Sequence, residues 1–254
     1  MKFKILLALV LFCFTFSYTG SLAKITSING IVITHRSDSF FWEEVGLGEE
    51  FFNFDELTTT TGSYCELTFR KGHILRLDPN SKVKIKAASM GSQYNIWQSL
   101  RISFGKIWIK IVKGVDDQDQ FFVETPYVSI AKQKAFFSVS APYGSISTYE
   151  GHIKVKQNDS LVSLGTGYEV DVNEQGILQD PQPLSEKTLI EFQELFTKTS
   201  IPAKELKSIY DQLLIKRENM QINSQKRTSE NTNSMGNKQN IFWDRIKNLF
   251  KFGK

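Results

Sequence analysis

Apolar and polar residues alternate with a period close to two from Lys24 to about Val172, in short runs set off by Gly, Pro, Asn or Asp. A period of two places successive side chains on opposite faces of an extended strand, and no helical period interrupts it here. Turn residues recur about every 8 to 12 residues, and no segment between the runs is long enough for the crossover helix of a parallel α/β unit. The pattern therefore predicts an all-β sandwich, barrel or solenoid.

The alternation is clearest between residues 66 and 86. Leu67 and Phe69 are expected on a dry face of their strand, and Glu66, Thr68 and Arg70 on a wet face. Lys71-Gly72 turns the chain, and the strand at 73–77 that follows is expected to point Leu75 and Leu77 inward. The sequence Asp-Pro-Asn-Ser at 78–81 is a concentrated turn signal, and an alternating Lys-rich strand follows it. About twenty residues thus hold three predicted strands.

The first 23 residues have the three parts of a secretory signal peptide. Two lysines supply positive charge, residues 5–16 are apolar except for Thr15, and small residues stand at −3 and −1 of a cut before Lys24. We therefore expect an exported protein of the periplasm or cell envelope. A permanent membrane anchor is the weaker alternative, because the apolar run is shorter than the ~18 residues of a spanning helix. Cys13 lies inside that run after Phe12, which does not make a lipoprotein signal.

The charge of the chain is unevenly distributed. Residues 24–215 hold 20 Lys and Arg against 24 Asp and Glu, whereas residues 216–254 hold 9 basic and 3 acidic residues. A mildly acidic body argues against a nucleic-acid-binding core. Attraction to anionic lipid or to another anionic polymer would come from the tail.

The period becomes helical after residue 184. We expect a pair of short amphipathic helices within 185–216, the first capped by Ser185 and the second with Pro202 in its first turn. Such helices most often pack on their own protein, although they could bind a partner. Residues 217–240 are rich in Asn, Ser, Gln and Lys and are expected to form a flexible polar linker.

Residues 241–254 form the predicted basic amphipathic helix at the end of the chain. Its apolar stripe needs cover from a membrane interface, a partner groove or the β body, and the polar linker favours a membrane surface or a partner. The residues expected to make this contact are Phe242, Trp243, Arg245, Ile246, Lys247, Leu249, Phe250 and Lys251.

Residues 28–172 resemble the FecR domain family, named after a bacterial periplasmic regulator of ferric citrate uptake. The resemblance rests on short blocks of residues that occur in the family's order and spacing. The first block, Gly30–Val32, together with Arg36, Trp42, Val45 and Gly48, resembles the start of the family's domain. The blocks are Gly30–Val32, Leu57–Thr58, Thr61–Ser63, Glu66–Phe69, Gly72, Leu75–Ser81, Gly105–Trp108, Phe122–Pro126, Phe137–Val139, Tyr149–Val155 and Leu164–Tyr168.

The resemblance implies an elongated, twisted, solenoid-like all-β domain at residues 24–180 that contacts other envelope proteins and is not an enzyme. Founding members signal through a membrane-spanning helix to a cytoplasmic segment that controls a sigma factor, and we do not expect that segment in this chain. The sequence departs from the family at two places. Asn53–Glu56 stands where Gly-Asp is usual, and Lys134-Ala135 stands where Gly-Thr is usual.

The sequence contains no spaced motif for a metal, phosphate or dinucleotide, so we expect no catalytic residue and no cofactor. His35, His73 and His152 are far apart, and Asp116–Asp119 lacks the glycine and closing glutamate of a calcium loop. Cys65 and His73 flank a turn as a nucleophile and base would, but a buried apolar role fits Cys65 better.

Two hypotheses for function follow, and a hydrolase ranks third. The first is a non-catalytic, exported interaction or scaffold module that binds another envelope protein and contacts a membrane or second partner through its tail. The second is a carbohydrate- or peptidoglycan-binding module that stacks sugar rings on Trp42, Trp97 and Trp108, although large aromatic residues on strands more often lie in the core.

Overall fold

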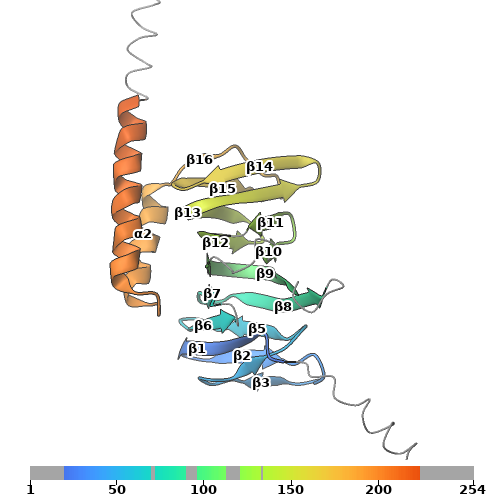
Figure 1. Ribbon diagram of the computed structural model, residues 1–254. Coiled ribbons are helices and arrows are strands. Elements are labelled where there is room, and N and C mark those ends of the chain that lie inside the picture. The colour runs from blue at the N-terminus through green and yellow to red at the C-terminus, as the bar shows by residue number, and fades with distance from the viewer. Residues whose placement is uncertain (1–19, 70–71, 90–95, 113–120, 133, 224–254) are drawn as a thin grey trace, which may run out of the picture.

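The computed structural model describes residues 20–69, 72–89, 96–112, 121–132 and 134–223. The body is built almost wholly of strands, which confirms the all-β prediction for it (Figure 1). The strands are stacked in two sheets, and every pairing between neighbours is antiparallel except that of β9 with β10. Because two long strands belong to both sheets, all the strands form one connected network.

The first sheet contains nine strands. In spatial order they are β4 (Glu50–Phe51), β1 (Ala23–Asn29), β6 (Tyr64–Phe69), β7 (Ile74–Leu77), β9 (Ile96–Ile111), β12 (Ala135–Ala141), β13 (Gly144–Gln157), β15 (Tyr168–Val172) and β16 (Gln182–Pro183).

The second sheet also contains nine strands and shares β9 and β13 with the first. In spatial order they are β3 (Trp42–Glu44), β2 (Val32–His35), β5 (Glu56–Thr59), β8 (Lys82–Ser89), β9, β10 (Phe121–Glu124), β11 (Ser129–Lys132), β13 and β14 (Ser160–Gly165).

A glycine lies where each shared strand passes from one sheet to the other. Gly105 has φ +92, and a Cβ there would lie 2.4 Å from the Cα of Ser81. Gly151 has φ +83, and a Cβ there would lie 2.7 Å from the carbonyl oxygen of Lys134. Only glycine tolerates both the left-handed backbone and such close approach. At the second departure from the family pattern, Ala135 is regularly paired with Gly151, so the crossing is made without a glycine at 134 or 135.

Apolar side chains of both sheets form one buried cluster. Leu67 and Phe69 belong to it, as the alternation predicts. Glu66, expected on the wet face, is fully buried. The reason is that the helical segment covers the outer face of the first sheet, which the local pattern of the strand could not reveal.

The helical segment contains α2 (Glu186–Glu194), the short 3-10 helix η1 (Leu195–Thr197) and a long helix at 203–223. Ser185 caps α2 as predicted, because its hydroxyl accepts a hydrogen bond from the Thr188 N–H at 3.2 Å. The second helix is not short, since it begins at 203 and continues beyond 216 to 223, so the first seven residues of the predicted linker are helical. The remainder of the predicted linker and the predicted helix at 241–254 lie outside the described residues.

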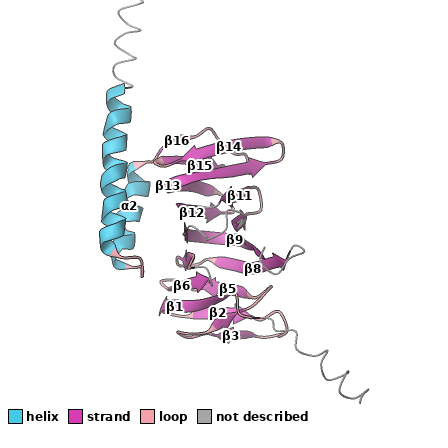
Figure 2. Cartoon of the chain, viewed as in Figure 1, coloured by secondary structure: helices cyan, strands magenta, loops and turns pink. Residues whose placement is uncertain are grey.

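The helices pack beside the first sheet, as Figure 2 shows. Their apolar side chains form a second cluster with residues from the outer face of the sheet. At its centre, the ring of Phe192 is stacked on that of Tyr149 at a centroid distance of 4.5 Å, and Tyr149 is stacked on Trp108 at 5.3 Å. The prediction that the helical pair packs on its own protein is therefore confirmed, and the surface that it covers is that of the β body.

Candidate interaction surface

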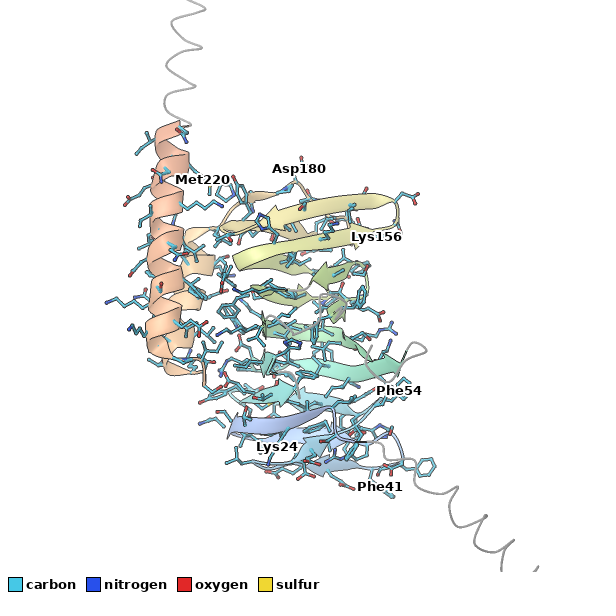
Figure 3. All side chains as sticks on the ribbon, viewed as in Figure 1. Lys24, Phe41, Phe54, Lys156, Asp180 and Met220 are labelled. Carbon is cyan, nitrogen blue, oxygen red and sulfur yellow. The ribbon has the colours of Figure 1, made fainter. Side chains whose placement is uncertain are left out.

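Exposed apolar side chains gather at the β3 end of the stack. Of the sixteen large hydrophobic residues that are exposed in the described part of the chain, seven lie between residues 31 and 54. Exposed hydrophobic residues that stand singly are ordinary, but a concentration of them marks an interaction site. Figure 3 shows Phe41 and Phe54 on the same side of this end. We call the following residues the aromatic end: Phe40, Phe41, Trp42, Phe52 and Phe54.

The buried carboxylate of Asp55 holds the two loops of the aromatic end together. It accepts hydrogen bonds from the backbone N–H of Ser37 at 3.0 Å and from the backbone N–H of Phe52 at 2.9 Å. The guanidinium of Arg36 donates to it at 3.0 Å and also pairs with Glu49 at 2.6 Å. These bonds join the loop before β3 to the loop after β4, so the two segments that carry the exposed aromatic residues are fixed relative to each other. A cleft of ≈490 Å³ lies between the two loops.

Phe54 has a backbone conformation that a bulky residue rarely adopts. Its φ is +71, in the left-handed region, and its side chain is 51% exposed. Left-handed backbone costs about 1–2 kcal/mol in a residue with a Cβ. Phe54 and Asp55 lie in the segment where the family resemblance leads one to expect Gly-Asp, so an aromatic residue stands in backbone that suits glycine. Strain of this kind, on an exposed side chain, points to a role in function rather than in packing.

The aromatic end is also acidic. Residues 36–55 contain six carboxylates against one guanidinium, and only the carboxylate of Asp55 is buried. Two lysines lie at its border, Lys24 beside Gly48 and Lys82 over the ring of Trp42 at 4.9 Å. Lys82 is also paired with Glu56 at 2.8 Å, and Lys84 pairs with Glu56 as well. The exposed carboxylates are Asp38, Glu43, Glu44, Glu49 and Glu50.

Glu56 beside this surface is held in its charged form. Partial burial works to raise its pKa, but hydrogen bonds and charge from Lys82 and Lys84 outweigh that effect and keep the pKa below its usual value. The carboxylate therefore stays ionised at the border of the aromatic end.

A second polar cluster lies under the helices. Arg76 pairs with Asp78 at 3.1 Å, stacks on Tyr64 at 4.0 Å and donates to the carbonyl of Lys198. The indole N–H of Trp108 donates to Asp78 at 2.7 Å. A cavity of ≈390 Å³ is lined by this cluster and by α2 and η1. Arg76 and Trp108 contact the helical segment directly and Asp78 holds both of them, so the cluster serves to dock the helical segment.

The tryptophans of the carbohydrate hypothesis do not form one platform. Trp108 is buried and contacts the helices, whereas Trp42 is 44% exposed at the aromatic end. The side chain of Trp97 lies outside what the structure describes.

The pair suggested for a hydrolase lies in the core. Cys65 is fully buried, and burial raises the pKa of its thiol to about 12, which disfavours a nucleophilic thiolate. His73 is buried, and its Nδ1 accepts a hydrogen bond from the Val112 N–H at 3.3 Å. The ring of His35 instead packs at a tilt against that of Trp42, with a centroid distance of 5.2 Å, and His152 is exposed on β13.

Other predicted sites fall where the structure describes little. Asp116–Asp119 and all eight tail residues from Phe242 to Lys251 lie outside the described residues. Among the residues that are described, no group of three or more His, Cys, Asp or Glu is placed to hold a metal ion. Within the same residues, no helix combines the length and apolar character needed to cross a membrane.

The aromatic end is absent from the predictions made above, although the sequence carries a signal for it. Phe40-Phe41-Trp42 and Phe51-Phe52-Asn53-Phe54 place six aromatic residues within a short stretch of the sequence. The alternation could not show that Phe51 is buried and its neighbours are exposed, because that depends on the fold of both loops.

Comparison with known proteins supports the resemblance. Residues 55–154 match the family described as FecR protein, and the aromatic end lies just before the matched segment. No curated protein matches the chain significantly.

Two solved structures of a proposed anti-sigma factor from Parabacteroides distasonis are similar to part of the chain. One, at 1.65 Å resolution, has a TM-score of 0.46 and 16% identity over 55% of this chain and 64% of that protein. The other, at 2.50 Å resolution, has a TM-score of 0.45 and 15% identity over 54% of this chain and 63% of that protein. The chain thus spans less than two thirds of the length of that protein. Over residues 55–154 this chain is therefore similar to the FecR family.

Proposed function

We propose that this chain is a non-catalytic interaction or scaffold module of the bacterial cell envelope that binds another envelope protein through its β body. The observation that carries the proposal is the aromatic end, a cluster of exposed rings braced by buried Asp55 and including strained Phe54. Clusters of aromatic residues are the usual anchors of protein interfaces. The similarity of residues 55–154 to the FecR family agrees with a role in protein contact.

Photo-crosslinking in the native bacterium tests the proposal. A photoreactive amino acid at Phe41 should yield an adduct with a defined envelope protein, because that side chain is 75% exposed within the cluster. The matched control is Ile190, which is 51% exposed on α2, away from the cluster. An adduct at 41 and none at 190 supports the proposal. No adduct at 41, or equal adducts at both positions, contradicts it.

Export is a second part of the proposal and rests on the signal-like residues 1–23. The structure adds a constraint, since Leu22 and Ala23 are buried and β1 begins at Ala23. A cut before Lys24 would remove both residues from the core but leave the remainder of β1 paired with β6. Mass spectrometry of the protein from the envelope fraction should find Lys24 as the first residue. A chain that keeps residue 1, or that stays in the cytoplasmic fraction, would contradict cleavage or export.

The tail contact completes the proposal. The eight residues from Phe242 to Lys251 are the candidates to contact a membrane or a second partner, as the sequence predicts. Trp108 is occupied in packing against the helices, and Trp42 is the one exposed tryptophan among those with a described side chain, so the described tryptophans do not favour carbohydrate binding.

A further inference from the structure

We propose that the aromatic end of one copy binds the basic segment 241–254 of a second copy, so that the chain associates head to tail. The inference rests on the proposed function as an interaction or scaffold module and names a partner for its surface. Three properties of the chain support it: charge, apolar character and the distance between the two ends of the fold.

The charges of the two parts are opposite. The aromatic end exposes five carboxylates, and Arg36 within it is already paired with Glu49 and Asp55. Segment 241–254 contains four basic residues and one acidic residue, a net charge of +3. Opposite potentials accelerate encounter and fix the orientation of partners. The basic residues are Arg245, Lys247, Lys251 and Lys254.

The apolar parts also suit one another. The sequence of the segment places Phe242, Ile246 and Phe250 at helical spacing, an arrangement that lays an amphipathic helix into an apolar groove. The aromatic end offers exposed rings beside a cleft of ≈490 Å³. A helix of fourteen residues would be about 21 Å long, which is enough to contact both loops.

The fold favours a second copy over the same chain. The described part of the long helix ends near β16, at the opposite end of the stack from β3 (Figure 1). Each sheet is nine strands wide, and eight spacings of about 4.8 Å put the two ends of the stack about 40 Å apart. Residues 224–240 number seventeen, and a linker of that length with the flexibility that its sequence predicts would span roughly 20–25 Å. Docking on the same body would stretch that linker, whereas docking on a neighbour would not.

Such a contact joins different surfaces of the two copies. It leaves the aromatic end of one copy and segment 241–254 of the other free to bind further copies. Contacts of this type extend into chains unless the geometry closes a ring. The mass of the particle should therefore rise with protein concentration, and more so at low salt, because the charges are exposed.

Light scattering and sedimentation of the full chain with substitutions test the proposal. Glu43→Lys with Glu44→Lys reverses charge on the body, and Lys247→Glu with Lys251→Glu reverses charge on the segment. Each double variant alone should associate about tenfold more weakly than the wild type. A mixture of the two should restore association, because each reversed surface then meets a reversed partner. Phe41→Ser, or termination after Asn240, should also leave a monomer.

The control reverses two exposed acids elsewhere, Glu174→Lys with Asp180→Lys, and should leave association unchanged. Asp180 lies at the other end of the stack (Figure 3). A wild type that is monomeric at every concentration and salt, or a termination variant with wild-type mass, overturns the inference. The inference is also overturned if the mixture of the two double variants fails to restore association. It is overturned as well if segment 241–254 binds anionic vesicles while the body substitutions leave the mass of the particle unchanged.

The crosslinking experiment separates this inference from the proposed function. An adduct from position 41 to a different envelope protein, in a chain that does not self-associate, overturns the head-to-tail inference alone. Absence of both the adduct and self-association overturns both proposals. An adduct between two copies, which vanishes on termination after Asn240, supports the inference directly.

Discussion

The backbone N–H of Ser200 donates a hydrogen bond of 2.8 Å to Oε2 of Glu66, although 134 residues separate the two in the sequence. Glu66 is fully buried on β6 and lies 3.8 Å from the guanidinium of Arg76, which itself donates to the carbonyl of Lys198. Two strands and the connection between the helices are thereby joined at one point. This relationship shows that the helical segment is an integral cover of the first sheet.

Glu66→Ala should destabilise the protein by about 3 kcal/mol. The substitution leaves the buried Arg76 without one of its two carboxylates and the Ser200 N–H without an acceptor, and each buried unpaired group is costly. Urea unfolding measures the change. The matched control is Glu124→Ala, which breaks the partly exposed pair with Lys86 and should cost less than about 1 kcal/mol. Equal losses of unfolding free energy at both positions would show that the buried cluster stabilises the protein no more than the pair of Glu124 with Lys86 does.

Phe54→Gly should be more stable than Phe54→Ala by about 1 kcal/mol. Both variants remove the ring, but only glycine also relieves the left-handed backbone at φ +71. At Phe52, whose φ is not positive, the order should be reversed, because glycine loses more conformational entropy than alanine on folding. The four variants are compared by urea unfolding. The same order at both positions would mean that Phe54 is not strained.

Gly105→Ala should be severely destabilising, by about 3 kcal/mol or more. The added Cβ would lie 2.4 Å from the Cα of Ser81 and 2.5 Å from the carbonyl oxygen of Asn80, both backbone atoms, at φ +92. The strand could cross between the sheets only by distortion. Gly46→Ala is the control, because a Cβ there meets no atom within 4 Å, and its melting temperature should stay near that of the wild type. A mild effect at 105 would contradict the close approach.

Asp171→Asn should raise the melting temperature at pH 7 and have little effect at pH 3. Burial and the charge of Glu169 raise the pKa of Asp171, and Lys187 offsets this only in part. A carboxyl with a raised pKa in the folded state favours folding when protonated, and that contribution is lost as pH rises through the folded-state pKa. At pH 7 the charged form is therefore a penalty, which asparagine removes. At pH 3 the carboxyl is mostly protonated in both states.

Thermal unfolding at the two pH values checks this expectation. Asp180→Asn, on an exposed residue, is the control and should change the melting temperature little at either pH. A gain for Asp171→Asn that is equal at pH 3 and pH 7 would show that the effect does not come from ionisation.

The strands of the body could be predicted well because each carries its own alternating pattern. Leu67, Leu75 and Leu77 are buried as the period of two predicts, and Ser185 caps its helix as predicted. The family blocks between residues 55 and 154 could also be read directly, since they depend on turns and strands of fixed spacing. The end of the second helix was misjudged, because polar residues after 216 can continue a helix that is already anchored by packing.

The sequence by itself determined the β-rich class, the turns and the helical character of the segment after residue 184, because these depend on local periodicity and capping. Only the tertiary structure decided that Glu66 is buried, that β9 and β13 serve both sheets, and that the rings near Phe41 and Phe54 share one surface. Each of these depends on contacts between residues distant in the chain. Burial and exposure are properties of the packed molecule, and the alternation of a single strand contains no information about what covers it.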